Sequence, residues 1–334
     1  MDTQRSTEDR IHIERYSPAH REEWDSFIAN SKNGTFLFLR DYVGYLGESI
    51  EDCSLLIRDE RNRMVAVLPG HIEAGTYLSH GRLTYGGFIT DESTRLPLMV
   101  RIFDATLTWL RDAGLNAFIY KTIPHIYHRV PAEEDRYALS LIGAEWIRSG
   151  MLAVVRPAAR VPYQDRRRRA IRKARERGLS VRATDDYPEY WRLLSQVLMD
   201  RYQTNPIHSL EQIETLRAAF PNNIRLHACF DGPEMLAGVV VYKSARVARA
   251  QYIASSSGGR SAGALDLVID HLITEQYADV EAIDLGTSDE QSGRVLNVGL
   301  IDQKEGFGAR AVALDQYRID LNGWEPGRLA GALK

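Results

Sequence analysis

The second half of the chain contains a segment of small residues with the composition of an anion-binding loop. Residues 251–266 place Gly258, Gly259 and Gly263 between a strand-like run and a helix-like run. Backbone N–H groups at the start of a helix bind negative charge where no bulky side chain covers them. Arg260 would add a charge-assisted contact to a phosphate. The alternative is an ordinary turn, because the spacing matches neither a P-loop nor a dinucleotide-binding fingerprint.

A second polar segment follows the next expected strand, and it contains Asp284, Ser288, Asn297, Lys304 and Glu305. Ligands of α/β proteins usually bind beyond the end of a strand. Lys304 and Glu305 have the chemistry of a base, an acid or a charge pair. The alternative is that both residues lie at the solvated end of a short helix.

The segment between the two halves of the chain is strongly basic. Eight Arg and Lys residues lie between Arg166 and Arg177, and Ile171 and Ala174 are spaced as on a helix that Gly178 ends. Such a helix is either a phosphate-binding patch, for tRNA or a nucleotide-linked molecule, or a solvated connection between two domains. No aromatic residue interrupts the run, so stacking of single-stranded bases is unsupported.

The elements that must position these residues occur in the same order in both halves. In each half, two helices precede a run of strands, a longer helix and a further strand, and Trp24 and Trp191 lie in the first helix of each series. Mixed elements that recur at a nearly fixed separation predict a duplicated domain. The alternative is ordinary alternation within one α+β chain. The predicted fold class is α+β, with two tandem domains, each a mostly antiparallel mixed sheet flanked by helices.

Periodicity, turns and caps predict the individual elements. In the first half we expect helices at 37–47 and 96–112, and strands at 53–58, 64–70, 76–78, 83–89, 117–121 and 143–155. In the second half we expect helices at 210–220 and 262–276, and strands at 224–230, 235–242, 247–254, 282–285 and 311–321. Ser209 is the expected N-cap of its helix, with Gln212 three residues further on.

Length and composition limit the class of protein. The chain has 334 residues, 44% of them hydrophobic, and is long enough for two cores. A formal net charge of −3 provides no overall field that would attract DNA. Cys53 and Cys229 each lie in an apolar run, which predicts buried, unpaired thiols in a reducing compartment.

The sequence shows neither a secretion signal nor a membrane span. Residues 1–10 are polar and charged, and no apolar run reaches the roughly 20 residues that a bilayer requires. We therefore expect a cytoplasmic protein. His125 and His128 have a spacing compatible with a metal, but no Cys or carboxylate clusters with them, so no metal site is expected.

The order of elements, together with the Lys-Glu-Gly-Phe sequence at 304–307, resembles the GNAT superfamily of acyltransferases. Over residues 10–322 the chain is similar to FemAB-like proteins of bacterial cell-surface polysaccharide clusters. The resemblance implies an N-acyltransferase with no tightly bound cofactor. The co-substrate would be an acyl-CoA or, as in other FemAB relatives, an aminoacyl-tRNA.

The same resemblance implies which residues form the site. The acyl donor would bind Ile253, Ser255, Gly258, Gly259, Arg260, Gly263 and Ala264. The catalytic candidates are Glu305 and Asp284 as bases, together with Lys304, Asn297 and Tyr252. The acceptor would contact His80, Arg82 and Tyr85 from the first half, and Arg201, Tyr202, His208 and Ser288 from the second.

The expected organisation is an acceptor-side domain at 1–155, a basic linker helix at 156–179, a donor-binding catalytic domain at 180–322 and a tail at 323–334. Residues 90–97, before the expected long helix of the first half, lack a glycine-rich turn, which supports placing the donor site in the second half alone. The leading hypothesis is acyl transfer to the amine of an amino sugar, expected to be nucleotide-linked, in polysaccharide synthesis. Two alternatives are an aminoacyl-tRNA-dependent transferase that forms an amide bond, and a non-catalytic binding protein.

Overall fold

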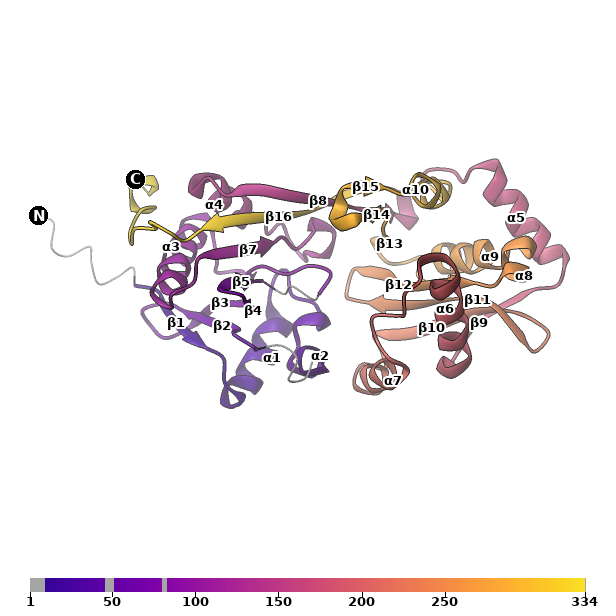
Figure 1. The fold of residues 1–334 in the computed structure, drawn as a ribbon, viewed down its shortest axis with the longest axis horizontal. Coiled ribbons are helices and arrows are strands. Elements are labelled where there is room, and N and C mark those ends of the chain that lie inside the picture. The colour runs from indigo at the N-terminus through magenta and orange to yellow at the C-terminus, as the bar shows by residue number, and fades with distance from the viewer. Residues whose placement is uncertain (1–9, 46–50, 80–82, 334) are drawn as a thin grey trace, which may run out of the picture. The chain divides into compact units, whose positions relative to one another are not determined.

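The computed structural model describes residues 10–45, 51–79 and 83–333, and its chain divides into two compact units. Unit 1 comprises Met1–Ser149 and Leu314–Lys334, and unit 2 comprises Gly150–Ala313. Each unit combines mixed β-sheet with flanking helices (Figure 1). The predicted fold class is confirmed.

Unit 1 contains a four-stranded sheet in the order β1-β2-β3-β6 and further strands in the order β4-β5-β7-β16-β8. Its strands are β1 (His12–Arg15), β2 (Leu55–Arg58), β3 (Met64–Leu68), β4 (His71–Glu73), β5 (Thr76–Leu78), β6 (Ile89–Thr90), β7 (Ala117–Lys121) and parts of β8 (Glu145–Val155) and β16 (Arg310–Asp320). Its helices are α1 (Arg21–Asn30), α2 (Arg40–Val43), α3 (Leu96–Asp112) and α4 (Glu134–Ile142).

Unit 2 contains strands in the order β8-β13-β12-β11-β10-β9, with a separate β14-β15 pair. Its strands are β9 (Ser180–Thr184), β10 (Ile224–Asp231), β11 (Glu234–Lys243), β12 (Val247–Ser255), β13 (Ala282–Thr287), β14 (Asp289–Glu290) and β15 (Val295–Leu296). Its helices are α5 (Asp165–Glu176), α6 (Tyr187–Tyr202), α7 (Leu210–Ala219), α8 (Ser257–Ala262), α9 (Ala264–His271) and α10 (Val298–Glu305). A π-helical turn, Leu272–Gln276, continues α9.

Local signals account for several element boundaries. The bounds of α3 are those predicted, with Pro97 in its first turn and Gly114 at a φ of 81° beyond its end. The predicted capping box of α7 is confirmed, since the Ser209 side chain accepts from the Gln212 amide and the Gln212 side chain accepts from the Ser209 amide. Asp186 caps α6 by accepting from the amide of Glu189.

Three predicted elements differ from the structure. The helix expected at 37–47 is a 3₁₀ turn, Phe36–Phe38, followed by α2, because Leu39 between them has extended backbone angles. Its predicted end includes residues outside the described ones. The strand expected at 83–89 is reduced to β6, whose pairing covers only Ile89 and Thr90. The loop expected before the helix at 262–276 contains a helix of its own, α8.

The chain path also differs from the predicted domain boundaries. Strand β16 begins in unit 2 and ends in unit 1, where Gln316–Asp320 pair with β7. Beyond it, Trp324 and Leu329 are buried in the core of unit 1 instead of forming a tail. The basic helix α5 belongs to unit 2. Because strand pairing joins segments far apart in sequence, composition alone did not reveal this exchange.

Two further expectations concern cysteines and membranes. Cys53 and Cys229 are both buried and unpaired, as predicted. Of the helices in the described segments, none has the length and apolar character needed to cross a bilayer.

Candidate active site

Unit 2 opens between its two parallel strands. Strands β12 and β13 pair only from Val247 with Ala282 to Arg249 with Asp284. Beyond these residues β12 stays paired with β11 on its other side as far as Ser255, and Thr287 of β13 pairs with β8. The facing edges of β12 and β13 are therefore not bonded to each other along their carboxyl-terminal parts.

The opening coincides with a β-bulge. Along β11, Val240 pairs with Tyr252 whereas Val241 pairs with Ala250, so Gln251 is the extra residue on β12. A bulge bends a strand and redirects its side chains, and bulges are frequent next to active sites.

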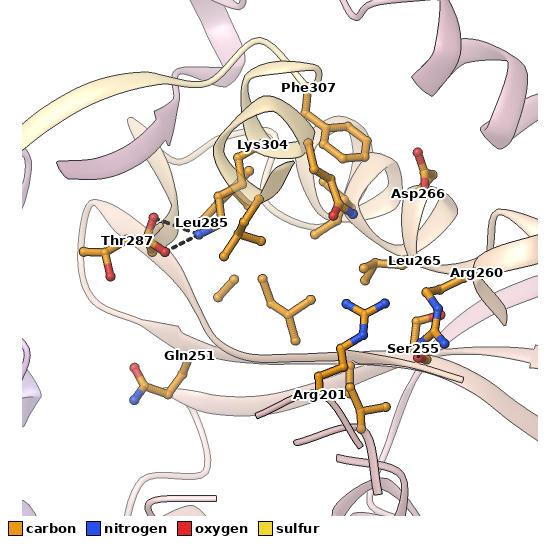
Figure 2. A pocket seen from close by; sticks show the side chains of 18 of the residues that line it. Arg201, Gln251, Ser255, Arg260, Leu265, Asp266, Leu285, Thr287, Lys304 and Phe307 are labelled. Atoms are coloured by element: carbon orange, nitrogen blue, oxygen red, sulfur yellow. Dashed lines mark hydrogen bonds between the residues drawn. The ribbon is translucent and has the colours of Figure 1, made fainter. Parts of the chain in front are cut away.

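A cavity of about 530 Å³ lies over this opening (Figure 2). Its walls come from the end of α6, from α9 and from α10, and its floor comes from β12 and β13. The lining residues are Arg167, Val197, Leu198, Arg201, Tyr202, Arg249, Ala250, Gln251, Ile253, Ala254, Ser255, Arg260, Leu265, Asp266, Ile269, Leu285, Gly286, Thr287, Leu300, Gln303, Lys304 and Phe307. We call this cavity the strand-split cleft.

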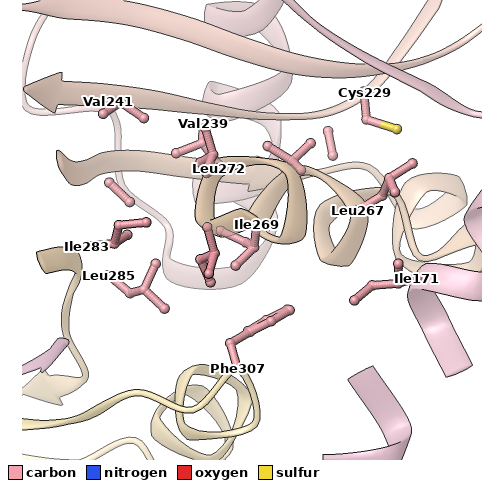
Figure 3. Packing of buried hydrophobic residues seen from close by; sticks show 14 of the residues in the cluster. Ile171, Cys229, Val239, Val241, Leu267, Ile269, Leu272, Ile283, Leu285 and Phe307 are labelled. Carbon is pink, nitrogen blue, oxygen red and sulfur yellow. The ribbon is translucent and has the colours of Figure 1, made fainter. Parts of the chain in front are cut away.

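The cleft rests on the hydrophobic core of unit 2. Ile269, Leu285 and Phe307 belong both to the buried core cluster and to the lining, and Figure 3 shows them together. Burying such side chains stabilises a fold by about 1.5–3 kcal/mol each. The position of the cleft is thus fixed by the same packing that holds the unit together.

The lining has an excess of positive charge, because it includes five Arg or Lys residues and only one carboxylate, Asp266, while Asp284 beneath it pairs with Arg249. Asp266 already pairs with Arg167, whose Nη1 lies 2.6 Å from its Oδ1. Arg260 donates from Nη1 to the carbonyl oxygen of Ser255 at 2.7 Å. That partner is uncharged, so this bond does not neutralise the guanidinium. Clefts with an excess of one charge concentrate ligands of the opposite charge. The strand-split cleft is suited to a polyanionic ligand.

Lys304 is the buried cation of the cleft, with 6% of its surface exposed. Its Nζ donates to the carbonyl oxygens of Gly286 at 3.2 Å and Thr287 at 2.5 Å, both at the carboxyl-terminal end of β13. Burial lowers its pKa to about 8, with Asp284 acting in the opposite direction. An ammonium has three N–H donors, so one remains beyond the two that these carbonyl groups accept.

Asp284 lies beneath the cleft and is fully buried. Its Oδ2 pairs with Nη1 of Arg249, and its Oδ1 accepts from the amide of Gly286 at 2.7 Å. Gly286 has a φ of 77°, a conformation that favours glycine. Asp284 therefore ties the two strands together where they begin to separate, and its carboxylate is engaged by these contacts.

The predicted donor loop is mostly packed backbone. Ser256 caps α8 by accepting from the Gly259 amide, and a side chain at 259 would clash with the Leu236 carbonyl group. Gly263 has a φ of 78°, and a side chain there would clash with the Ala170 carbonyl group on α5. Close approach of backbone segments explains these glycines. Of the seven predicted donor residues, the cleft lining includes Ile253, Ser255 and Arg260, and omits Gly258, Gly259, Gly263 and Ala264.

Two of the predicted acceptor residues, Arg201 and Tyr202, line the cleft from the end of α6. His208 is instead buried and shares a hydrogen bond between its Nδ1 and the hydroxyl of Tyr252. Burial lowers the pKa of His208 to about 4, so it is neutral at physiological pH. The indole of Trp191 donates to the His208 carbonyl oxygen at 3.1 Å, so these residues fix the connection between α6 and α7.

The other predicted residues of unit 2 lie outside the cleft lining. Asn297 is the N-cap of α10, where its side chain accepts from the Leu300 amide at 2.9 Å. Glu305 is exposed at the end of the same helix. Ser288 is buried, and its carbonyl oxygen accepts from the amide of Asn297. Helix geometry explains why Glu305 is exposed. Neighbouring positions on a helix point in different directions, and Lys304 faces inward.

The predicted acceptor residues of the first half lie in unit 1. His80 and Arg82 fall outside the described residues. Tyr85 is buried, with its ring 4.4 Å from that of Tyr127 and its hydroxyl 3.1 Å from Thr35 Oγ1. Tyr85 therefore contributes to the packing of unit 1.

Sequence reasoning missed several lining residues. Arg249 and Gln251 of β12 were not predicted, although Gln251 alternates with the predicted Ile253 and Ser255. The alternation of 251, 253 and 255 at the end of the strand was the signal available for Gln251. Arg167, Asp266 and Phe307 come together only through the tertiary fold.

The basic helix α5 is largely neutralised by carboxylates. Six of the eight basic residues from Arg166 to Arg177 form ion pairs: Arg166 with Asp302, Arg167 with Asp266, Arg168 with Asp165, Arg172 with Glu176, Arg175 with Asp270 and Arg177 with Asp231. The pairs to Asp266 and Asp270 attach α5 to α9. These contacts support the structural interpretation of the basic run over a phosphate-binding patch.

Comparisons with known proteins address the fold and the family. Residues 164–291 match the family model described as "Acetyltransferase (GNAT) domain". No match was found among curated proteins. The structure is similar to FemX, with a TM-score of 0.66 and 12% identity over 93% of this chain and 98% of that one. It is also similar to L-PGS from Bacillus licheniformis, with a TM-score of 0.60 and 12% identity over 91% and 92% of the two chains.

A tandem GNAT protein from the clavulanic acid biosynthesis pathway has the same fold, with a TM-score of 0.51 and 11% identity over 93% of this chain and 99% of that one. The family match covers the part of the cleft from α5 to β13, and α10 with Lys304 lies beyond the matched residues. The structural likeness extends over both units. Residues 164–291, which lie in unit 2, thus match the acetyltransferase (GNAT) domain, and the chain as a whole shares its fold with FemX and with the tandem GNAT protein.

Proposed function

We propose that this protein is an N-acyltransferase whose acyl donor is a thioester on a phosphorylated carrier, an acyl-CoA, bound in the strand-split cleft. The observation that carries the proposal is the separation of β12 from β13 under a cationic lining. An open strand edge offers N–H and C=O groups to an extended, amide-containing chain. The cationic side chains offer contacts to phosphates.

The two ends of the cleft suit different parts of such a donor. Figure 2 shows Arg260 and Ser255 at one end, and Gln251, Thr287 and Lys304 at the other, with Arg201 between them. The carrier phosphates would bind near Arg260. The thioester would then lie at the bulge of β12, close to Lys304.

Lys304 would stabilise the charge that develops in the reaction. The amine nitrogen attacks the thioester carbon, the carbonyl oxygen becomes an oxyanion, and the C–S bond then breaks to release a thiol. The remaining N–H of Lys304 donates to that oxyanion, a type of contact that is often the largest contribution to catalysis. Strand amides near Gln251–Ser255 would be further donors.

A dedicated carboxylate base is not needed in this scheme. Glu305 is exposed outside the lining, and Asp284 is engaged by Arg249 and Gly286. A cationic cleft lowers the pKa of a bound amine, because nearby positive charge disfavours the ammonium form. The proton of the amine then passes to water, and binding both substrates together supplies much of the rate.

The acceptor we propose is the amine of an amino sugar, linked to a nucleotide, in polysaccharide synthesis in the cytoplasm. Arg201 and Tyr202 support this choice, because a guanidinium binds phosphate and an aromatic ring packs on sugar or base faces. We assign unit 1 to the acceptor side, since its crossover helix α3 begins without a glycine-rich turn.

A second candidate is aminoacyl transfer from an aminoacyl-tRNA. Its support is the fold shared with FemX and with a protein whose name is L-PGS, and a related structure is described as a putative lysylphosphatidylglycerol synthetase. The ion-paired state of α5 argues against a large RNA-binding surface on that helix.

A thiol-release assay tests the proposal. The full-length protein is incubated with acetyl-CoA or butyryl-CoA and a panel of amines that includes hexosamines and UDP-linked amino sugars. Amine-dependent release of free CoA is the expected result. Thermal shift with acetyl-CoA and with bulk tRNA provides a second readout, because a ligand of the native state raises its melting temperature. A shift with tRNA alone, without thiol release, would favour the second candidate. No shift and no release would contradict both.

A further inference from the structure

Gln251 occupies a singular position in the cleft. It is the bulged residue of β12, it lines the cleft, and it lies two residues beyond Arg249, the last residue of β12 that pairs with β13. Figure 2 shows its side chain pointing away from Arg260, toward the end of the cleft where Thr287 lies. If carrier phosphates bind near Arg260, the Gln251 carboxamide lies beyond the reacting carbon, where the amine must approach.

The orientation of the Gln251 carboxamide is fixed by Arg249. Nε of Arg249 lies 3.1 Å from Oε1 of Gln251. A guanidinium only donates hydrogen bonds, so the amide oxygen must face Arg249 and the NH₂ group must face the opposite way. Arg249 is in turn held by the fully buried Asp284. This chain of contacts presents a hydrogen-bond donor, and not an acceptor, to the cleft.

We propose that Gln251 contacts the acceptor and donates a hydrogen bond from Nε2 to an oxygen adjacent to the reacting amine. Arg249 and Asp284 act through it as positioning residues. This inference rests on the proposed acyl transfer and adds a requirement to it. The acceptor must carry a hydroxyl or carbonyl oxygen near its amine, as an amino sugar does and a simple alkylamine does not.

Two substitutions at this position separate hydrogen bonding from packing. Gln251→Met keeps the length of the side chain and removes the donor. Gln251→Glu keeps the shape, strengthens the contact to Arg249 and presents only oxygen to the substrate. Gln196→Met is the matched control, because Gln196 lies on α6 and bonds to Asp200 outside the cleft lining.

The measurement is the KM for the amine that gives the fastest thiol release, together with the KM for acetyl-CoA. We expect Gln251→Met to raise the KM for the amine about three- to tenfold, the cost of one uncharged hydrogen bond, with little change for acetyl-CoA. Gln251→Glu should raise it at least as much. The control should change neither value.

Arg249→Met provides an independent check of orientation. Released from Arg249, the carboxamide can rotate, so the KM for the amine should rise, and adding Gln251→Met should raise it no further. Unchanged acceptor KM values in both Gln251 variants would overturn the inference. Tighter amine binding by Gln251→Glu would also overturn it, since the substrate would then present a donor. Neither result affects the proposed function, whose own failure is the absence of amine-dependent thiol release in the unsubstituted protein.

Discussion

Each unit contains a parallel strand pair whose connection includes a helix, and the two pairs differ in structure just beyond their paired residues. In unit 1, β5 and β7 pair through Leu78 with Ile119. Ser79 then continues the contact, because its amide donates to the Ile119 carbonyl oxygen at 3.0 Å and its hydroxyl accepts from the amide of Lys121. In unit 2, β12 and β13 separate directly after Arg249 and Asp284. One pair is held together by side-chain contact, and the other opens into a cleft.

Each unit also has a lysine beside its parallel pair, half-buried in unit 1 and buried in unit 2. Lys121 of β7 donates from Nζ to the Leu83 carbonyl oxygen at 2.8 Å, and burial lowers its pKa to about 8. Lys304 has a pKa of about 8 for the same reason. A cation with a lowered pKa therefore does not distinguish the two units. The distinguishing feature is that Lys304 lies at the carboxyl-terminal end of β13, where that strand has separated from β12.

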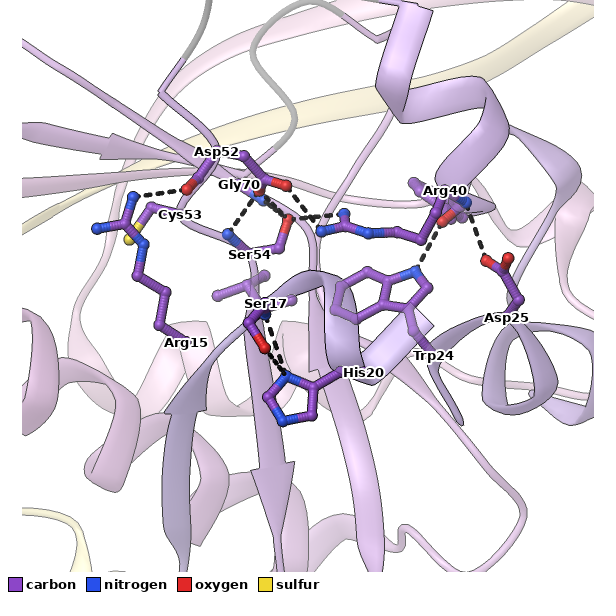
Figure 4. A network of polar contacts seen from close by, with 12 residues as sticks. Arg15, Ser17, His20, Trp24, Asp25, Arg40, Asp52, Cys53, Ser54 and Gly70 are labelled. Atoms are coloured by element: carbon purple, nitrogen blue, oxygen red, sulfur yellow. Dashed lines mark hydrogen bonds and ion pairs between the residues drawn. The ribbon is translucent and has the colours of Figure 1, made fainter. Parts of the chain in front are cut away.

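The charged groups near the start of unit 1 stabilise its structure, in contrast to the cations that line the cleft of unit 2. Around Arg40, Figure 4 shows a network in which the guanidinium pairs with Asp52. The two groups are 2.7 Å apart, and the guanidinium also lies over the ring of Tyr16. Arg40 is 6% exposed, and its contacts join α2 to the segment before β2. This cation holds structure together, whereas Arg260 in unit 2 lines a cavity.

Of the substitutions considered, Lys304→Met should cause the largest loss of acyl transfer activity. Without the N–H that faces the oxyanion, kcat should fall about 100- to 1,000-fold. Folding stability should be kept, because an apolar side chain of similar length replaces a buried ammonium. Steady-state kinetics and thermal melting provide the two readouts. Lys121→Met is the matched variant in unit 1. Equal losses of kcat in the two variants would contradict the proposed difference between the units.

Replacing Gly263 by Ala should destabilise the protein by about 2–5 kcal/mol, since it combines a left-handed backbone with a clash against the Ala170 carbonyl group. Gly114 in unit 1 has a similar φ of 81° but open space around it. Gly114→Ala should therefore cost only about 1–2 kcal/mol. Urea unfolding followed by circular dichroism measures both. An equal effect at the two positions would show that α5 does not pack closely on the turn before α9.

Replacing Arg260 by Met should weaken acyl-CoA binding about tenfold, because a charge-assisted contact to phosphate is lost. Arg95, which precedes α3 in unit 1, is the corresponding control, and Arg95→Met should leave the dissociation constant unchanged. Isothermal titration calorimetry at low salt measures both values. Weaker binding in the Arg95 variant alone would place the donor in unit 1.

The rate of acyl transfer should fall severalfold as pH rises above 8. Lys304 donates to the oxyanion only while protonated, and its pKa of about 8 places the loss of that proton just above this pH. Lys304→Arg, with a cation that stays charged, should retain part of the activity and lack the alkaline decline. A profile of kcat against pH distinguishes a protonated Lys304 that donates to the oxyanion from a neutral Lys304 that acts as a base. A rate that continues to rise through pH 9 would make neutral Lys304 a base.

Much of the fold was predictable because it depends on local signals. The bounds of α3 and β7 follow from apolar periodicity and turn residues, and the cap of α7 follows from Ser209 and Gln212. The exchange of β16 between the units was not predictable. Pairing with β7 is a contact between segments almost 200 residues apart, and amino-acid composition does not indicate such a contact.

The candidate site was predictable only in part. Lys304, Arg260 and Arg201 were identified from their polar surroundings, and all three line the cleft. Gly258 and Gly263 lie outside the cleft lining, because glycine before a helix also serves close packing, and here Gly263 meets the backbone of α5. Gln251 was missed as a site residue because a bulge depends on the register of two strands.

Hydrogen exchange with and without acyl-CoA tests the central claim most directly. If the donor binds between the separated strands, saturating acetyl-CoA should slow exchange at the amides of 250–255 and 285–287, and leave those of 76–79 in unit 1 unchanged. Protection confined to unit 1, or unchanged exchange along β12 and β13 despite measured binding, would contradict the assignment of the strand-split cleft to the acyl donor.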